Sequence, residues 1–305
     1  MKSATAEARS LSLESDANVH LVRDPEIARE YARLDYLTPC ERLLVETYVA
    51  PGAAVLDLGV GGGRTTPHLL ARAGRYLGVD YSAEMIRHCR EKFPGVEFCE
   101  ADASNMPLLK DGSFDVIFFS FNGIDWLWPS EKLWSCIHEC RRLLRAGGVF
   151  IFSSHNPRSI FVWRGWDTDR VRAFSRRLVG RSHILYPLAV GAATTAKAAL
   201  SFFRSAAESV SRIVRRVPRK AFRERHGYMI DPAHPGLLNH YWTPENAISE
   251  LRSQGFQSLG VWCDEYPEKR SIYRADWYYY AFAKNGERAD VDGVVSHCAG
   301  ANESY

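Results

Sequence analysis

A run of glycines is the first feature of this sequence whose residue types and spacing suggest chemistry. The stretch VLDLGVGGGRTTPHLL, residues 55–70, places four glycines between a short apolar run and a segment with helical periodicity. Glycine takes positive φ angles readily and lets a ligand come into van der Waals contact with the main chain. A glycine-rich turn between a strand and a helix is typical of a loop that cradles a nucleotide.

Two acidic residues further along the chain suit the same purpose. Asp80 ends the next apolar run, and Asp102 follows the one after that, in Ala101-Asp102-Ala103. The carboxyl ends of parallel strands meet at one edge of a sheet, so both carboxylates are expected beside the glycine loop. There, Asp80 can accept hydrogen bonds from both hydroxyls of a ribose, and Asp102 is placed to meet an adenine amino group.

The elements that would position these residues alternate along the first half of the chain. Buried strands are predicted at Ala54–Leu58, Tyr76–Asp80, Val96–Glu100, Phe114–Phe121 and Val149–Ser154. Helices are predicted at Ile27–Tyr48, Thr66–Arg72, Ala83–Phe93 and Glu131–Leu144. This alternation predicts an α/β fold with a doubly wound, mostly parallel, Rossmann-like sheet and helices on both of its faces.

The last part of the chain completes a sheet of seven strands. A helix is predicted over Thr243–Gln254, followed by strands at Ser258–Trp262 and Tyr278–Lys284. The two late strands have no crossover helix between them, so they are predicted to pair antiparallel. The expected organisation is a polar tail (1–26), a core (27–157 and 240–284), a helical insertion after the fifth strand (158–239) and a disordered tail (285–305).

Five motifs together resemble a known family. VLDLGVGGGR, VDYSAEMI, EADASNMP, FDVIFFSFNG and LLRAGGVF resemble, in order and spacing, the class I S-adenosylmethionine-dependent methyltransferases. The resemblance covers residues 50–154, and residues 241–284 are similar to the usual C-terminal part. It implies S-adenosylmethionine as cofactor. The cofactor contacts that it implies are Gly59, Gly61 and Gly63 at the amino acid part, with Asp57 organising the loop, Asp80 and Tyr81 at the ribose, Asp102 and Ala103 at adenine, Ser120 and Asn122 in the methyl-donor region, and Tyr36 over the methionine end.

The chemistry of methyl transfer indicates which further residues to seek. The enzyme has to align an acceptor with the methyl group and manage one proton, and no metal is required. A hydroxyl acceptor is favoured over an amine, and histidine is the natural base near neutral pH. His155 directly follows the fifth strand and is expected to be the base or an acceptor ligand, against a structural role at the strand end. Asp125, His240 and Tyr241 are further candidates.

The segment after the fifth strand is strongly basic. Between residues 158 and 228 it has sixteen Lys and Arg against four Asp and Glu, although the net charge of the chain is only +3. Within it, residues 184–225 form an apolar stretch that runs into a basic amphipathic helix. Three interpretations stay open: a lid over an anionic acceptor such as a phosphate-linked sugar, a helix in peripheral contact with anionic lipid, and a helix packed on its own domain.

Several classes of partner and site are disfavoured. Nucleic-acid amino methyltransferases carry an Asn/Asp-Pro-Pro-aromatic motif after the fourth strand, where this chain has Ser120-Phe121-Asn122-Gly123, so no nucleic acid partner is expected. The seven cysteines include no CxxC pair, and Cys136 and Cys140 fit one face of a helix better than a zinc site. The reduced cysteines and the polar N-terminus favour the cytoplasm.

The sequence therefore predicts a methyltransferase acting on a small molecule or a sugar-containing metabolite. One alternative is a methyltransferase of a lipid-linked or polysaccharide acceptor at the membrane surface. Another is a nicotinamide-dependent oxidoreductase, which is disfavoured because the fingerprint G-x-G-x-x-G requires a glycine at Arg64. A third is a binding protein that keeps the fold without turnover.

Overall fold

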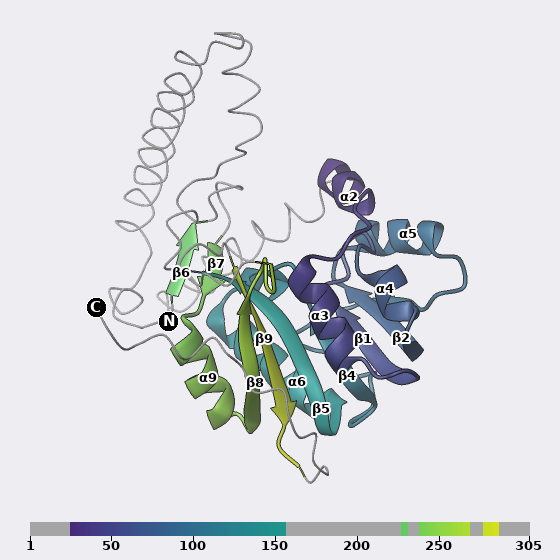
Figure 1. Ribbon diagram of the computed structural model, residues 1–305. Helices are drawn as coiled ribbons and strands as arrows, with labels where there is room; N and C mark the ends of the chain where they lie inside the picture. Colours follow the sequence, from purple (N-terminus) through teal and green to yellow (C-terminus); the bar gives the residue numbers. More distant parts are fainter. Residues whose placement is uncertain (1–24, 157–226, 231–237, 269–276, 287–305) are drawn as a thin grey trace, which may run out of the picture.

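A seven-stranded sheet dominates the structure, a computed structural model that describes residues 25–156, 227–230, 238–268 and 277–286 (Figure 1). The strand order is β3-β2-β1-β4-β5-β9-β8. β9 pairs antiparallel with both β5 and β8, and the other neighbouring pairs are parallel. The predicted α/β fold is confirmed. The strands are β1 (Ala53–Leu58), β2 (Ala73–Asp80), β3 (Phe98–Glu100), β4 (Phe114–Phe119), β5 (Leu144–His155), β8 (Phe256–Cys263) and β9 (Trp277–Lys284).

The central strands are continuously apolar because helices cover both faces of the sheet. Every residue of β1 is buried. Leu56 and Leu58 face the hydrophobic core on one side, and Val55, which precedes Leu56, faces the core on the other side. A strand buried on both faces needs no polar alternation, which is why the apolar runs were readable from the sequence.

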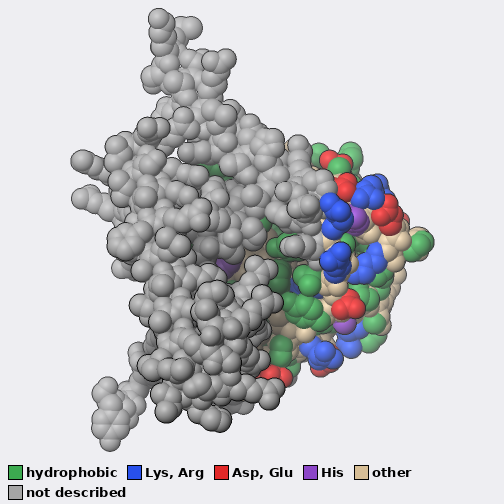
Figure 2. Space-filling view, turned by 90° about the horizontal axis from the view of Figure 1, so that it is seen from above, with side chains coloured by type: hydrophobic (Ala, Val, Ile, Leu, Met, Phe, Trp, Pro, Cys, Tyr) green, Lys and Arg blue, Asp and Glu red, His purple; other side chains and the backbone are tan. Residues whose placement is uncertain are grey.

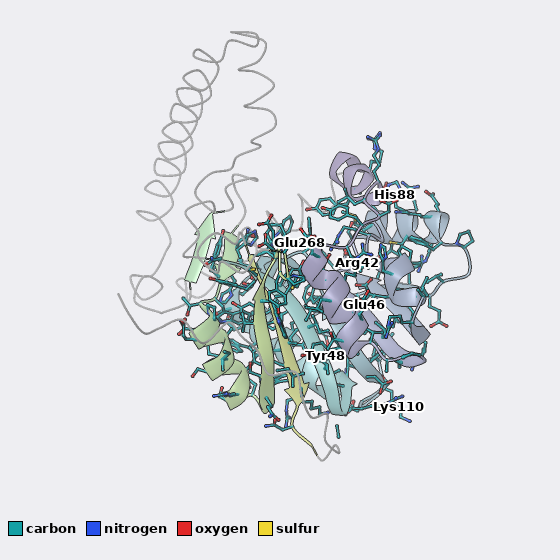
Figure 3. All side chains as sticks on the ribbon, viewed as in Figure 1. Arg42, Glu46, Tyr48, His88, Lys110 and Glu268 are labelled. Carbon is teal, nitrogen blue, oxygen red and sulfur yellow. The ribbon has the colours of Figure 1, made fainter. Side chains whose placement is uncertain are left out.

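Two groups of helices form these covering layers. α3 (Pro39–Tyr48), α4 (Thr66–Leu70) and α5 (Ala83–Lys92) supply buried side chains to one core. α6 (Ser130–Leu143) and α9 (Pro244–Ser253) supply those of the other, including Cys136 and Cys140. At the end of α3, Tyr48 lies with its ring centroid 6.4 Å from that of Trp262 on β8 (Figure 3).

The outer face of α5 carries paired charges. Arg87 bonds to Glu84 and to Glu91 at the surface. From above, acidic and basic side chains are interspersed over the described part of the molecule (Figure 2). Since the exposed Arg87 is paired with two glutamates, this face has the character of an ordinary solvated surface.

The N-terminal helix is broken in two, so the prediction of one helix over Ile27–Tyr48 is wrong. α2 (Pro25–Ala32) starts inside the predicted tail, and six residues (33–38) separate it from α3. Thr38 caps α3 with a reciprocal pair of hydrogen bonds. The hydroxyl of Thr38 accepts from the backbone N–H of Glu41, and the carboxylate of Glu41 accepts from the backbone N–H of Thr38. Pro39 follows the cap and keeps Thr38 extended, because proline disfavours the helical conformation of the preceding residue.

The fourth strand ends two residues earlier than predicted. Phe121 and Asn122 have φ angles of 58° and 62°, in the left-handed region, which a strand cannot contain. The 3-10 helix η1 (Gly123–Trp126) follows at once. The apolar pattern of FDVIFFSF does not predict this turn, because apolar residues indicate burial and not the backbone φ angle.

The described end of the predicted insertion is a strand pair rather than a helix. β6 (Gly227–Ile230) and β7 (Leu238–Tyr241) pair antiparallel in a small separate sheet. Residues 184–225, with the lid and membrane-contact interpretations, and most of both predicted tails lie outside the described residues, so the proposed domain division stays a prediction. No helix among the described residues is long and apolar enough to cross a membrane.

Candidate active site

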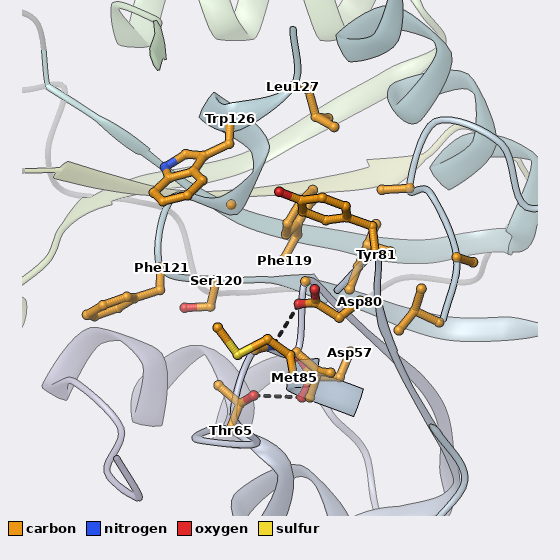
Figure 4. Close-up of a pocket in the computed structure, with 18 of the residues that line it drawn as sticks. Asp57, Thr65, Asp80, Tyr81, Met85, Phe119, Ser120, Phe121, Trp126 and Leu127 are labelled. Atoms are coloured by element: carbon orange, nitrogen blue, oxygen red, sulfur yellow. Dashed lines mark hydrogen bonds between the residues drawn. The ribbon is translucent and has the colours of Figure 1, made fainter. Parts of the chain in front are cut away.

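A pocket opens at the carboxyl ends of β1, β2 and β4 (Figure 4). The chain passes from β1 to β2 and β3 on one side, and then returns to place β4 on the other side of β1. This reversal of strand order leaves a crevice above the strand ends, where open α/β sheets bind their ligands. The predicted residues that line it are Asp57, Gly59, Gly61, Asp80, Tyr81, Asp102, Ala103 and Ser120.

Asp57 lies at the base of the pocket and holds the start of α4. Its Oδ2 accepts from the hydroxyl of Thr65 at 2.6 Å and from that of Tyr76 at 2.8 Å. Burial raises the pKa of this carboxyl to about 6, against the opposing effect of these two hydrogen bonds and of the Arg64 charge. The carboxylate thus ties three elements together beneath the glycine loop.

Asp80 joins the glycine loop to the end of β2. Its Oδ2 accepts from the backbone N–H of Gly61 at 2.9 Å, and its Oδ1 from that of Ser82 at 2.9 Å. Gly61 has a φ of +55°, a conformation that glycine adopts without steric cost. Burial raises the pKa of Asp80, and backbone hydrogen bonds from Ser82, Gly61 and Tyr81 oppose that rise. Of the roughly four acceptor positions of a carboxylate, these three contacts leave one for a ligand in the pocket.

The other glycines differ in what they contact. A Cβ on Gly62 would lie 2.3 Å from the backbone nitrogen of Ala32, so glycine here allows α2 to rest directly on the loop. Gly63, which the resemblance placed at the cofactor, is outside the pocket lining and lies against the ring of Phe93. Gly62, Arg64 and Thr65 line the pocket on either side of it.

Asp102 lies at the far end of the pocket but is already engaged. Its Oδ2 accepts from the Nζ of Lys132 at 2.8 Å, and its Oδ1 accepts from the backbone N–H and the hydroxyl of Ser104. Burial raises the pKa of Asp102, but the hydrogen bonds from Lys132 and Ser104 outweigh this, and the pKa lies below its ordinary value. A purine amino group would have to share this carboxylate with Lys132.

A buried ion pair in the pocket wall was missed in the sequence. The guanidinium of Arg64 donates to both oxygens of Glu41 on α3, one at 2.7 Å, and to the hydroxyl of Ser120 at 3.2 Å. Glu41 is wholly buried; burial raises its pKa, but the hydrogen bonds and charge of Arg64 outweigh this and the pKa falls. The guanidinium also lies over the ring of Phe121, 4.6 Å from its centroid.

Tyr36 does not line the pocket, contrary to the role implied for it. It lies in the connection between α2 and α3, is 46% exposed, and its carbonyl accepts from Arg64 at 2.8 Å. Tyr31, at the end of α2, lines the pocket instead. The prediction of one continuous helix led to the wrong tyrosine, because the break after α2 decides whether Tyr31 or Tyr36 faces the glycine loop.

One side of the pocket is aromatic. Phe121 and Trp126 lie across from the Asp57 side, and the ring of Tyr81 points into the space between (Figure 4). Trp128 also lines this side. Phe121 makes an edge contact with Trp277 of β9, with ring centroids 5.7 Å apart. The charged groups Arg64 and Lys132 of the lining are both paired with carboxylates, so this side offers flat apolar surface to a ligand.

The three catalytic candidates are brought together, beside the pocket rather than in its lining. The carboxylate of the fully buried Asp125 lies 2.8 Å from Nδ1 of His155, and it also accepts from the His155 backbone N–H at 2.8 Å and the Ser154 hydroxyl at 2.6 Å. Burial raises the pKa of Asp125, with the contacts of His155 opposing. The Tyr241 ring centroid is 5.3 Å from that of His155.

Asn122 sits next to these groups rather than at the methyl-donor pocket. It does not line the pocket; its side chain is directed to His155, with Nδ2 3.4 Å from Nε2. His240, the other candidate, faces Trp242 with ring centroids 4.4 Å apart. The turn that carries Asn122 and Asp125 also supplies Phe121, Gly123 and Trp126 to the pocket lining, so the histidine is separated from the pocket by one turn of chain.

The fold and the site define a methyltransferase domain, and comparison with known proteins supports this. Residues 55–148 match the family described as the methyltransferase domain. Over 105 residues the chain is 34% identical to a probable S-adenosylmethionine-dependent methyltransferase of Mycolicibacterium smegmatis, a match covering 34% of this chain and 39% of that protein. Over 137 residues it is 34% identical to the malonyl-[acyl-carrier protein] O-methyltransferase of Methylococcus capsulatus, covering 42% and 48%. The matches therefore span less than half of these relatives.

A solved structure agrees in fold. The 1,6-didemethyltoxoflavin-N1-methyltransferase of Burkholderia thailandensis, solved with 1,6-didemethyltoxoflavin and S-adenosylhomocysteine bound, is similar with a TM-score of 0.51. The similarity covers 92% of this chain and 90% of that one at 16% sequence identity, which is evidence for the fold alone. Together with the family match over residues 55–148, it supports a methyltransferase domain in this part of the chain.

Proposed function

We propose that this protein transfers the methyl group of S-adenosylmethionine to a hydroxyl group of a small molecule. The observation that carries the proposal is that Asp57, Asp80 and Asp102 line one pocket together with the glycine loop. Each carboxylate lies at or just beyond the carboxyl end of a different parallel strand of the sheet. This is the arrangement expected of a site that binds the ribose, the adenine and the amino acid part of one ligand.

The residues present fit that cofactor. Asp80 would hold the ribose, because it lines the pocket and its carboxylate keeps an acceptor position after its backbone contacts with Gly61, Ser82 and Tyr81. Gly59 and Gly61 would approach the amino acid part, and Asp102 with Ala103 would lie at the adenine. When bound, the cofactor supplies a methyl group on positively charged sulfur, which an in-line nucleophile can displace.

His155 is the proposed base for a hydroxyl acceptor. Asp125 accepts at Nδ1 and so keeps the proton on that nitrogen, which leaves Nε2 to take a proton once an acceptor hydroxyl replaces the Asn122 amide 3.4 Å away. The buried carboxylate also stabilises the imidazolium that forms when the hydroxyl loses its proton to Nε2. The Methylococcus relative is named an O-methyltransferase, which agrees with this choice of acceptor atom.

The proposed acceptor is an uncharged molecule with a flat apolar part. Phe121 and Trp126 supply aromatic surface, and the Arg64 and Lys132 charges in the lining are neutralised by Glu41 and by an aspartate. Neither cation is therefore available to an anionic acceptor without losing a partner. A recognition of phosphate-linked sugars or of lipid would have to come from residues 158–226, outside the described part of the chain.

Transfer of labelled methyl groups to a panel of acceptors tests the proposal. The full chain is incubated with methyl-labelled S-adenosylmethionine and with hydroxylated aromatic compounds, matched aromatic amines and sugar phosphates. Label in the hydroxyl compounds, lost in His155→Ala but kept in the exposed control His138→Ala, is expected. Label only in amines, or equal turnover by His155→Ala, would contradict O-methylation with His155 as base.

A further inference from the structure

One short turn holds both nitrogens of a single imidazole. Asp125 and Asn122 belong to the turn that follows β4, and the backbone N–H of Asp125 donates to the carbonyl of Asn122 at 3.1 Å. Asp125 meets Nδ1 of His155 at 2.8 Å, and Asn122 Nδ2 lies 3.4 Å from Nε2 on the other side of the ring. The histidine itself belongs to β5, so the turn acts as a clamp on the end of the neighbouring strand.

The backbone at Asn122 is specialised for this contact. Its φ of 62° is left-handed, a conformation that asparagine tolerates better than most residues. Its backbone N–H donates to the hydroxyl of Ser153 at 2.8 Å, which anchors the turn to β5. The side chain is therefore aimed at the ring by a fixed backbone, and glycine or aspartate could occupy the same backbone conformation with little strain.

The orientation of the amide indicates the protonation state of the ring. Asp125 accepts a hydrogen bond from the N–H at Nδ1, so Nε2 of a neutral ring carries no proton and acts as an acceptor. The Asn122 amide presents an N–H donor to this Nε2. The Oδ1 of Asn122 is buried and has no hydrogen-bond partner among the described residues. If the amide were turned over, Oδ1 would face Nε2, and this contact would be a hydrogen bond only with a proton on Nε2. The turned amide would also bury its NH₂ group where the acceptor Oδ1 now lies.

We propose that Asn122 is a positioning residue that keeps Nε2 of His155 unprotonated, and so able to take the proton of an acceptor hydroxyl. Asp125 by itself favours the imidazolium, because it is a carboxylate against one ring nitrogen. The amide donor at the second nitrogen opposes that effect, since a donor facing N–H is repulsive. The inference rests on the proposed function, in which the hydroxyl displaces the Asn122 amide from Nε2 and passes its proton to that nitrogen.

Other groups near the ring do not replace this effect. Tyr241 approaches from β7, and it is uncharged near neutral pH. The antiparallel neighbour of His155 on β9 is Trp277, which does not titrate. Among the described contacts of the ring, Asp125 is the one charged partner. Exchanging the amide of Asn122 for a carboxylate would therefore place a second anion against the same imidazole.

Titration of His155 by NMR tests the inference without cofactor or acceptor. The full chain is labelled with ¹⁵N-histidine, and the His155 signals are assigned by comparison with His155→Gln. The wild type is expected to carry the proton on Nδ1 when neutral. Asn122→Asp is expected to raise the titration midpoint by about one pH unit or more, and Asn122→Gly, which removes the donor without adding charge, to raise it by less.

The order of the three midpoints decides the matter. A neutral wild-type ring with its proton on Nε2, a midpoint for Asn122→Asp equal to that of the wild type, or a larger rise in Asn122→Gly than in Asn122→Asp would each overturn the inference. If Asn122→Asp does not fold, the wild-type tautomer and the direction of the Asn122→Gly shift still decide it. Failure of the chain to bind S-adenosylmethionine would instead refute the proposed function and leave this titration result unaffected.

Discussion

The carboxylate of Asp80 accepts the backbone N–H of Gly61 across the mouth of the pocket, at 2.9 Å. The contact joins the two segments that the sequence marks most clearly, the glycine loop after β1 and the acidic end of β2. It sets the shape of the loop before any ligand arrives, because Gly61 is in the left-handed region and its N–H is directed by a buried anion. Preorganisation of this kind lowers the cost of binding.

The elevated pKa of Asp57 makes stability depend on pH. An acid whose pKa rises on folding, from its ordinary value near 3.8 to about 6, binds more protons in the folded state over that range. The free energy of unfolding therefore falls as pH rises from about 4 to about 6, by up to about 3 kcal/mol if Asp57 acts alone. Urea unfolding of wild type and Asp57→Asn between pH 4 and pH 7 should diverge in slope, and parallel curves would contradict this.

Gly62 has no room for a side chain. The Cβ of Gly62→Ala would meet the backbone of Ala32 at 2.3 Å, so α2 must move away from the loop. We expect a loss of about 1–3 kcal/mol in the free energy of unfolding and weaker cofactor binding. Gly95→Ala is the matched control, since Gly95 has positive φ but open space, and it should cost stability without affecting binding. Equal cofactor affinity in Gly62→Ala and wild type would contradict the expectation that the contact of α2 with the glycine loop supports cofactor binding.

Removing one partner of the buried Arg64–Glu41 pair should lower the free energy of unfolding much more than replacing both partners with apolar residues. Arg64→Met leaves the Glu41 carboxylate buried without its cation, for an expected loss of about 3–5 kcal/mol. The double variant Arg64→Met, Glu41→Leu should recover most of that loss, as measured by chemical denaturation. Arg87→Ala, at the exposed α5 pair, should leave the unfolding midpoint unchanged. A double variant no better than Arg64→Met would contradict the isolated-charge explanation.

His155 and Asp125 should affect turnover rather than cofactor affinity. Loss of a general base typically costs roughly 10²- to 10⁴-fold in rate, so His155→Ala is expected to lower kcat by that range once an acceptor is known. Asp125→Asn should act in the same direction, because it no longer fixes the tautomer of the ring. Both variants should bind S-adenosylmethionine as the wild type does. A reduction in cofactor affinity equal to the reduction in kcat would indicate a merely structural pair.

The strand pattern of the sheet was predictable because burial on both faces removes polar residues from whole strands. Val55 to Leu58 and the core of FDVIFFSF could hardly form anything else in this composition. The acidic strand ends could be predicted for a similar reason, since their position depends only on where each apolar run stops. Asp80 and Asp102 were found this way, Asp57 was implied by the family resemblance, and all three line the pocket.

Contacts between distant segments could not be predicted. Glu41 appears in the sequence as an ordinary polar residue of an amphipathic helix, and nothing local shows that Arg64, 23 positions later, neutralises it. The left-handed turn at Phe121 is likewise hidden, because an aromatic residue in an apolar run predicts strand. Thr38-Pro39, with Glu41 three residues after the threonine, is by contrast a local pattern typical of a helix start, which the prediction of one helix over Ile27–Tyr48 overlooked.

Calorimetric titration with S-adenosylmethionine tests the central claim most directly. The full chain is titrated with S-adenosylmethionine and, separately, with NADH, beside Asp80→Ala and the surface control Glu91→Ala. The account predicts saturable binding of S-adenosylmethionine alone, lost in Asp80→Ala and kept in Glu91→Ala. Folded wild-type protein that binds NADH but not S-adenosylmethionine, or undiminished binding of S-adenosylmethionine by Asp80→Ala, would contradict it.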